Sequence, residues 1–132
     1  MVSIPDKNNG VFTSDALMAA ADAGMIKFHG AAGARQIQPS SVDLTLGSRA
    51  WRVRASFLPG AQRTVSDCLD GRLFMHEIDI SRGAVFERGC VYLVELQESL
   101  DLPAGISGLA NPKSSTGRID VFVRLVTDGG AA

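Results

Sequence analysis

The sequence predicts a mainly β fold, a sandwich or jelly roll that begins with one short helix. Several segments alternate apolar and polar residues with the two-residue period of a half-buried strand. Turn-forming residues separate them, as in Leu58-Pro59-Gly60 and Asp70-Gly71. Many short strands with turn signals between them are typical of sandwiches and jelly rolls, and no linker divides the chain. We therefore expect a single domain over residues 1–132.

The helical signal is confined to the N-terminal part of the chain. A helix is predicted from about Asp15 to Ala23, with Thr13 or Ser14 as its N-cap. Gly24 follows and can end the helix in the left-handed conformation. Apolar residues recur on one face of this helix and are assigned to the core: Leu17, Met18 and Ala21.

Strand patterns begin after a connector rich in glycine and alanine at residues 30–34. In residues 42–47 three apolar residues alternate with polar ones, and residues 51–54 continue the alternation. The least patterned part, between Ala55 and Phe74, is interpreted as a loop. Further strands are expected at Phe74 to Ile80, Val91 to Leu96, Ile106 to Ala110 and Val121 to Val126.

Composition narrows the class of protein without naming a function. With 132 residues and 45% hydrophobic content the chain can bury one core, and its net charge of −1 gives no reason to expect binding to nucleic acid or membranes. The richest apolar run is interrupted by Asp22 and Gly24, so neither a signal peptide nor a membrane span is predicted. Cys68 and Cys90 lack metal-type spacing, which favours reduced thiols in the cytoplasm.

The segment Asn111 to Arg118 concentrates cations, hydroxyls and a glycine in one short turn. Lys113 and Arg118 can supply charge to an anion, and two serines and a threonine can donate hydrogen bonds to phosphate oxygens. The spacing is not that of a P-loop. A helix that begins at Pro112, capped by a serine, explains the local pattern equally well.

Together with residues 37–47, Ile-Gln-Pro-Ser-Ser-Val-Asp-Leu-Thr-Leu-Gly, this segment resembles the dCTP deaminase family, which shares the trimeric fold of the dUTPases. The resemblance extends from about Ser14 to Thr127. The Asn-Pro-Lys variant of the second motif is similar to that of the longer, duplicated members. The resemblance implies a distorted jelly roll or β-barrel, incomplete at its C-terminus, in the first part of a longer polypeptide.

The resemblance also implies an activity, the conversion of dCTP to dUTP and ammonia. By the family motif, Ser114 positions the catalytic water and Arg118 reaches the water and the base, which makes these two the catalytic candidates. Lys113 and Ser115, with Ser114 and Arg118, are the candidates for substrate binding. Mg²⁺ would arrive with the triphosphate, since this ion is usually held by phosphate and water oxygens. A trimer-like homo-oligomer is expected.

Zinc-dependent deamination does not fit the sequence. That chemistry uses a His and two Cys to hold the metal, with a nearby Glu and a Pro-Cys-x-x-Cys pattern. His29 and His76 lie far apart, and neither is followed by the required residues. We expect no metal ligands in the chain, and both histidines are expected to be surface residues or hydrogen-bonded strand residues.

The general base of the family is a Glu on a strand downstream of the second motif, and the sequence ends before that strand. Four upstream glutamates remain: Glu77, Glu87, Glu95 and Glu98. None carries the family pattern; Glu87 is interpreted as a surface charge beside a turn and Glu95 as part of a strand's polar face. Asp43 is expected to support the fold or a subunit contact. Loss of a general base typically costs about 10²–10⁴-fold in rate, so the isolated chain is expected to be a poor enzyme.

Three functions stay open on sequence grounds. The first is dCTP deamination, with this chain supplying the phosphate-binding and water-binding part of the site. The second is a non-catalytic nucleotide-binding or assembly module. The third is a dUTPase-like pyrophosphatase, which differs in base recognition.

Overall fold

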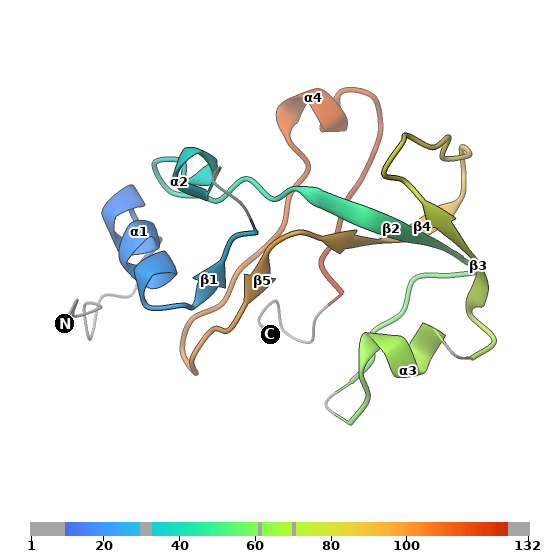
Figure 1. Cartoon of the computed structure of the whole chain (residues 1–132), viewed down its shortest axis with the longest axis horizontal. Coiled ribbons are helices and arrows are strands. Elements are labelled where there is room, and N and C mark those ends of the chain that lie inside the picture. Colours follow the sequence, from blue (N-terminus) through green and yellow to red (C-terminus); the bar gives the residue numbers. More distant parts are fainter. Residues whose placement is uncertain (1–9, 30–32, 61, 70, 127–132) are drawn as a thin grey trace.

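The computed structural model describes residues 10–29, 33–60, 62–69 and 71–126 (Figure 1). Four helices and five strands lie in these ranges. The helices are α1 (Ser14–Asp22), α2 (Gly33–Gln36), α3 (Val65–Leu69) and α4 (Ser114–Gly117). The strands are β1 (Ile26–Lys27), β2 (Leu46–Val53), β3 (Phe74–Asp79), β4 (Val91–Leu96) and β5 (Ser99–Leu100).

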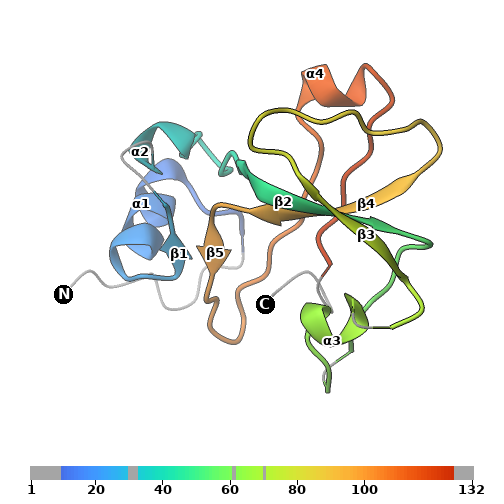
Figure 2. The ribbon, with the colours of Figure 1, turned by 45° about the vertical axis from the view of Figure 1, so that its right-hand side comes forward.

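The strands form two antiparallel sheets, which confirms the predicted mainly β fold. One sheet pairs β1 with β5, and the other has the order β3-β2-β4. In Figure 2 the first sheet lies beside α1 and α2, while the larger sheet lies on the other side of the molecule. Strand β4 runs almost directly into β5, so these two strands connect the sheets.

The N-terminal helix packs its apolar face on β1. Leu17, Ala20 and Ile26 form a buried cluster, against which partly buried side chains such as Leu100 pack. The predicted helix is confirmed with a shift of one residue, and Gly24 follows it with a φ of 79°, as a left-handed terminus requires. The core position predicted for Met18 is wrong, because this side chain lies off the face that contacts β1 and is 45% exposed.

The larger sheet is built around β2. Its Ala50 lies opposite Ile78 of β3 and Val94 of β4, and it is fully buried. The strand predicted at residues 91–96 is confirmed. The strand predicted at residues 74–80 is also present, but it ends one residue earlier, at Asp79. The strand expected at residues 42–47 is mostly wrong, since the chain enters β2 only at Leu46 and Val42 makes an isolated bridge to Ile37.

Two predicted strands are absent from the described residues. Neither 106–110 nor 121–126 pairs with another strand there, and Phe122 is 73% exposed. Both segments have suitable β propensity, but a strand needs a partner for its N–H and C=O groups. The two predicted strands are therefore wrong: both segments lack regular secondary structure.

The region between Ala55 and Phe74 is not only a loop, because it contains α3. Thr64 and Asp67 explain that helix: the Thr64 N–H donates to Asp67 Oδ2 at 2.8 Å, and the Asp67 N–H donates to Thr64 Oγ1 at 3.1 Å. This is a capping box, a local signal that sequence analysis could have found. The bond from the Thr64 N–H is also the main reason why the pKa of Asp67 lies below its ordinary value.

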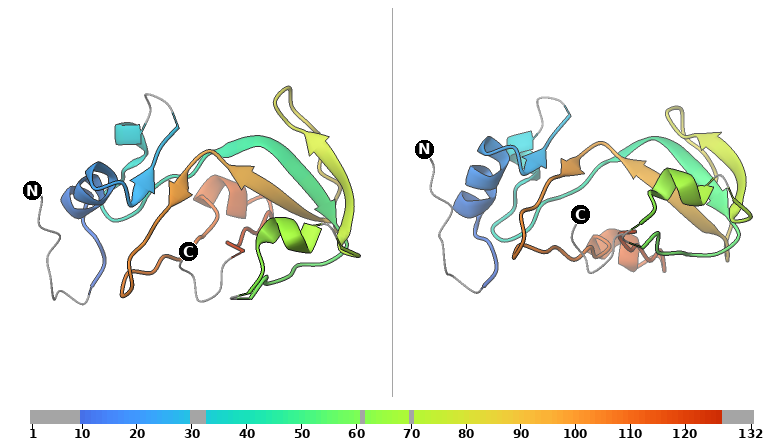
Figure 3. Two further views of the ribbon diagram at one scale, coloured as in Figure 1. Left: turned by 60° about the horizontal axis from the view of Figure 1, so that its bottom comes forward. Right: turned by 90° about the horizontal axis from the view of Figure 1, so that it is seen from below.

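The larger sheet is strongly curved. Figure 3 shows β2 and β4 as an arch, with α3 and the chain around α4 beneath it. The second motif therefore lies on the concave side of the sheet.

Candidate functional site

The second motif folds as an extended approach followed by a single helical turn. Lys113 occupies the N-cap position of α4, with φ −57° and ψ 149°, and its C=O accepts the Gly117 N–H at 2.9 Å. Pro112 therefore lies one residue before the cap, and no side chain caps the helix. The alternative interpretation of this segment as a helix start is right in that a helix begins here, but its details are wrong: Pro112 is not the first helical residue and no serine caps the helix.

The four predicted site residues share one short surface segment. Ser114 and Ser115 form the first positions of α4, Lys113 precedes them, and Arg118 follows the helix; all four are exposed. Within the described residues, the Arg118 side chain makes no hydrogen bond or ion pair. Two cations and two hydroxyls are thus open to a ligand from solvent.

Lys113 contacts the first motif. Its Nζ lies 2.7 Å from Asp43 Oδ2 in an ion pair whose side chains are 66% and 31% exposed, respectively. The two motifs, far apart in the sequence, therefore meet through one charged contact. Asp43 was expected to support the fold or a subunit contact, and its pairing with Lys113 was not predicted.

Asp43 is held in a tight loop of the first motif. Its N–H donates to the Gln36 C=O at 2.8 Å, and its C=O accepts from Gln36 Nε2 at 2.8 Å. Gln38 Nε2 lies 3.4 Å from the Oδ2 atom that also accepts from Lys113. Backbone and side chain of Asp43 are both fixed.

Glu98 anchors the same loop from the strand β5 side. It is 9% exposed, and its carboxylate accepts from the Thr45 N–H at 2.9 Å and from Gln36 Nε2. Burial alone raises the pKa of Glu98, but these hydrogen bonds outweigh it, so that the pKa lies below its ordinary value. No local pattern in the sequence indicates this contact, because Gln36 and Glu98 are brought together only by the fold.

The other glutamates have positions that suit structural roles. Glu95 on β4 pairs with Arg49 on β2 at 3.2 Å, and the hydrogen bond from Arg49 lowers the pKa of the Glu95 carboxyl. Glu77 lies on β3 and is exposed. Glu87 is also exposed and lies before the turn that leads into β4. The positions of Glu87 and Glu95 agree with their interpretation from the sequence.

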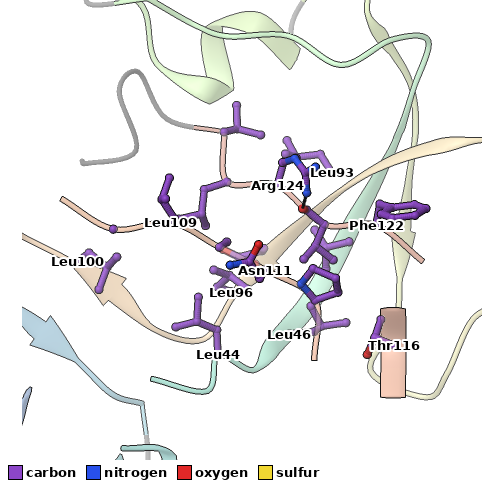
Figure 4. Close-up of a pocket in the computed structure, with 18 of the residues that line it drawn as sticks. Leu44, Leu46, Leu93, Leu96, Leu100, Leu109, Asn111, Thr116, Phe122 and Arg124 are labelled. Carbon is purple, nitrogen blue, oxygen red and sulfur yellow. Dashed lines mark hydrogen bonds between the residues drawn. The ribbon is translucent and has the colours of Figure 1, made fainter. Parts of the chain in front are cut away.

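A broad apolar hollow lies on the concave side of the sheet, beside α4 (Figure 4). Its volume of about 3530 Å³ is far above the roughly 300–1,000 Å³ of ordinary ligand pockets, so it is an open face rather than a fitted small-molecule site. Lys113, Ser114 and Ser115 lie at its border with apolar residues of the sheet and of the segments around α4. Labelled apolar residues in this view are Leu44, Leu46, Leu93, Leu96, Leu100, Leu109 and Phe122.

Other features bear on metal and membrane binding. In the part of the chain that the structure describes, no three His, Cys, Asp or Glu side chains gather in a way that could hold a metal ion. His29 and His76 are both exposed, as predicted. No helix among the described residues has the length and apolar character needed to span a membrane. Cys68 is buried and Cys90 half-buried, both as free thiols.

Residues 8–132 match the family model described as the 2′-deoxycytidine 5′-triphosphate deaminase (DCD) N-terminal domain. The chain belongs to the dCTP deaminase family. The crystal structure of 2′-deoxycytidine 5′-triphosphate deaminase from Agrobacterium tumefaciens is similar to this chain, with 52% sequence identity and a TM-score of 0.76. The match covers 84% of this chain and 33% of that one. No curated protein sequence matches significantly.

The comparison confirms the family and the dUTPase-like fold that the two motifs indicated. The chain spans about a third of the length of the Agrobacterium protein chain it matches. Membership of the longer, duplicated group stays a prediction. The roles of Lys113, Ser114, Ser115 and Arg118 likewise remain predictions from the motif.

Proposed function

We propose that this dCTP deaminase family chain binds dCTP through its triphosphate at residues 113–118 and takes part in hydrolysis to dUTP and ammonia. The observation that carries the proposal is the exposure of two cations and two hydroxyls on one short turn, within the region that matches the family. The chain as a whole has a net charge of −1, so its overall charge does not attract a polyanion. Localised cations, not bulk charge, would attract the nucleotide.

Each residue of the turn has a separate role in this proposal. A Lys ammonium carries three N–H donors, of which the contact with Asp43 uses one, so Lys113 retains donors for phosphate oxygens. Ser115 adds a hydroxyl to the same phosphates. Arg118 follows α4 and places its charge toward the base end of the nucleotide. Mg²⁺ would bind to the phosphates and water, and it requires no cage of protein ligands.

The chemistry we propose is attack of water on C4 of cytosine, followed by loss of ammonia. The Ser114 hydroxyl holds the water, and Arg118 balances the negative charge that develops near the reacting base. A carboxylate must take one proton from the attacking water and deliver it to N3 of cytosine; the second water proton moves to the amino group as the C4–N bond breaks and ammonia leaves. Neither Glu95, which pairs with Arg49, nor Glu98, which holds the loop of the first motif, is free for that task. The general base in this proposal is therefore a different residue.

We also propose that the chain works as a trimer-like homo-oligomer in the cytoplasm. Large apolar side chains remain exposed on the concave side, among them Leu46, Leu109 and Phe122. Contiguous apolar surface of this kind is typical of sites that another protein surface covers. The free thiols of Cys68 and Cys90 support a reducing compartment. Sedimentation velocity measures the mass in solution, and a monomer at all concentrations would contradict the assembly.

Calorimetric titration tests the binding site. We expect dCTP, dUTP and inorganic tripolyphosphate to bind comparably and weakly, because the phosphates supply most of the contacts. Lys113→Ala and Arg118→Ala are each expected to weaken binding of all three, to an affinity that titration can still measure. The matched control is Arg88→Ala, which removes one exposed cation from the loop before β4. Absence of binding by a chain that circular dichroism shows to be folded would refute the proposal.

Ammonia release from dCTP tests the chemistry. In any preparation that deaminates dCTP, Ser114→Ala and Arg118→Ala are each expected to lower turnover without loss of fold, because one orients water and the other stabilises charge. Loss of one such group typically costs about 10²–10³-fold. Nucleotide binding without ammonia release would favour a non-catalytic binding module. Release of pyrophosphate from dUTP would favour the pyrophosphatase.

A further inference from the structure

We propose that Asp43 is a positioning residue for Lys113, and that Glu98 is the buried anchor that keeps Asp43 in place. The inference rests on the proposed function, since it concerns the same triphosphate-binding turn. It assigns the first motif a specific task in that site. The contact chain runs from Glu98 through Gln36 to Asp43 and ends at Lys113.

The Asp43 carboxylate is the fixed partner of the ion pair. Gln36 bonds both the N–H and the C=O of Asp43, each at 2.8 Å, and Gln38 reaches its Oδ2 at 3.4 Å. Lys113, in contrast, is a long side chain on the surface with a large rotamer entropy. A carboxylate held by its own loop can therefore select one Lys113 rotamer, whereas Lys113 cannot order the loop.

Glu98 makes the loop itself rigid. One carboxylate oxygen accepts from the Thr45 N–H and the other from Gln36 Nε2, so Glu98 joins both ends of the segment that carries Asp43. Gln36 Nε2 also contacts the Asp43 C=O at 2.8 Å. Glu98 is 9% exposed, and among the described residues it makes no hydrogen bond or ion pair with Lys113. The hydrogen bonds of Glu98 therefore reach Lys113 through the loop that carries Asp43.

Two roles for Asp43 predict opposite results. If Asp43 only neutralises Lys113, its removal frees a cation and strengthens binding to a polyanion. If Asp43 positions Lys113, its removal lets the ammonium sample other rotamers, and the entropy of ordering it again opposes binding. The pair leaves two Lys113 donors unused, so neutralisation and ligand binding do not exclude each other. Of the two roles, the one proposed for Asp43 is the positioning of Lys113.

The test is titration with sodium tripolyphosphate of four proteins: wild type, Asp43→Asn, Lys113→Met and the double variant. We expect Asp43→Asn to weaken binding about three- to tenfold in the wild-type background, and to have no further effect once Lys113 is replaced. Glu95→Gln is the matched control, since it removes the same charge from an exposed ion pair. Loss of a negative charge by itself strengthens anion binding, so a weakened affinity cannot come from net charge.

Equal or tighter binding by Asp43→Asn, or an equal loss in both Lys113 backgrounds, overturns the positioning role. If Asp43→Asn does not fold, Gln38→Ala removes the other bond to the same carboxylate and is expected to weaken binding in the same direction; unchanged binding overturns the inference.

The order of Lys113 gives a readout independent of binding. NMR relaxation at its side-chain carbon and nitrogen is expected to show greater motion in Asp43→Asn and in Glu98→Gln than in Glu95→Gln. If wild type binds no tripolyphosphate but this difference is present, the proposed function fails and positioning stands. If wild type binds and Lys113 moves no more in the variants, positioning fails and the proposed function stands.

Discussion

Glu98→Gln is expected to destabilise the fold, by an amount that depends on pH. The carboxylate accepts one hydrogen bond at each oxygen, from the Thr45 N–H and from Gln36 Nε2. A glutamine has one oxygen and an NH₂ group, so at least one donor loses its acceptor. Hydrogen bonds to charged groups contribute about 1.5–3 kcal/mol, and Glu98 lies at the edge of the core, so we expect a loss of about 2 kcal/mol at pH 7.

The direction in which this loss of stability changes with pH follows from the pKa of Glu98. Because the pKa of Glu98 is lower in the folded chain than in the unfolded one, its stabilisation is fully present above the unfolded pKa of about 4.3 and is lost as the pH falls through the folded pKa. The difference between wild type and Glu98→Gln is therefore expected to be large at neutral pH and to shrink below about pH 4.

Urea denaturation at several pH values measures both quantities. A loss of about 2 kcal/mol corresponds to roughly 8 °C in the thermal midpoint of a chain of this size, which thermal melts can confirm. Glu95→Gln is the control, because its exposed pair with Arg49 is screened by solvent and contributes less. A Glu98→Gln variant as stable as wild type at pH 7, or a difference that is independent of pH, would refute the reasoning.

Two further substitutions test packing, by urea denaturation. Gly47→Ala is expected to cost about 1–3 kcal/mol, because an added Cβ would lie 3.1 Å from the Glu95 backbone oxygen. Gly10→Ala meets no atom of the described residues within 4 Å and is expected to be tolerated. Equal stability of the two variants would contradict this. Val53→Ala, at 1% exposure, is expected to lose about 1.5–3 kcal/mol and Val85→Ala, at 87% exposure, almost nothing. A large loss at residue 85 would show that the described burial is wrong.

Local patterns predicted the elements whose causes are local. The helix at Ser14–Asp22 followed from its apolar spacing and the glycine after it, although the Thr13 side chain at its N-cap makes no capping hydrogen bond. Strand β4 followed from a β-rich run between turns. The predicted strands at 106–110 and 121–126 failed because β propensity does not supply a pairing partner. Whether a segment forms a strand depends on which other segment lies beside it and can pair with it. A single sequence does not show this.

In the candidate site, too, the local features could be predicted from the sequence and the long-range contacts could not. The turn with Lys113 and Arg118 could be predicted as a binding segment, because it concentrates cationic and hydroxyl side chains. Its contact with Asp43 could not, because the ion pair joins two segments that only the fold brings together. Glu98 was considered as a base, and the structure gives it a different task that its sequence neighbours do not reveal.

The central claim is that the turn from Lys113 to Arg118 binds the triphosphate of dCTP, and NMR titration of isotope-labelled chain with dCTP tests it most directly. The amide resonances of residues 113–118 are expected to shift most, with a smaller shift at Asp43 through its contact with Lys113. Tripolyphosphate is expected to reproduce these shifts. Saturable shifts confined to another part of the chain, with residues 113–118 unchanged, would contradict the claim.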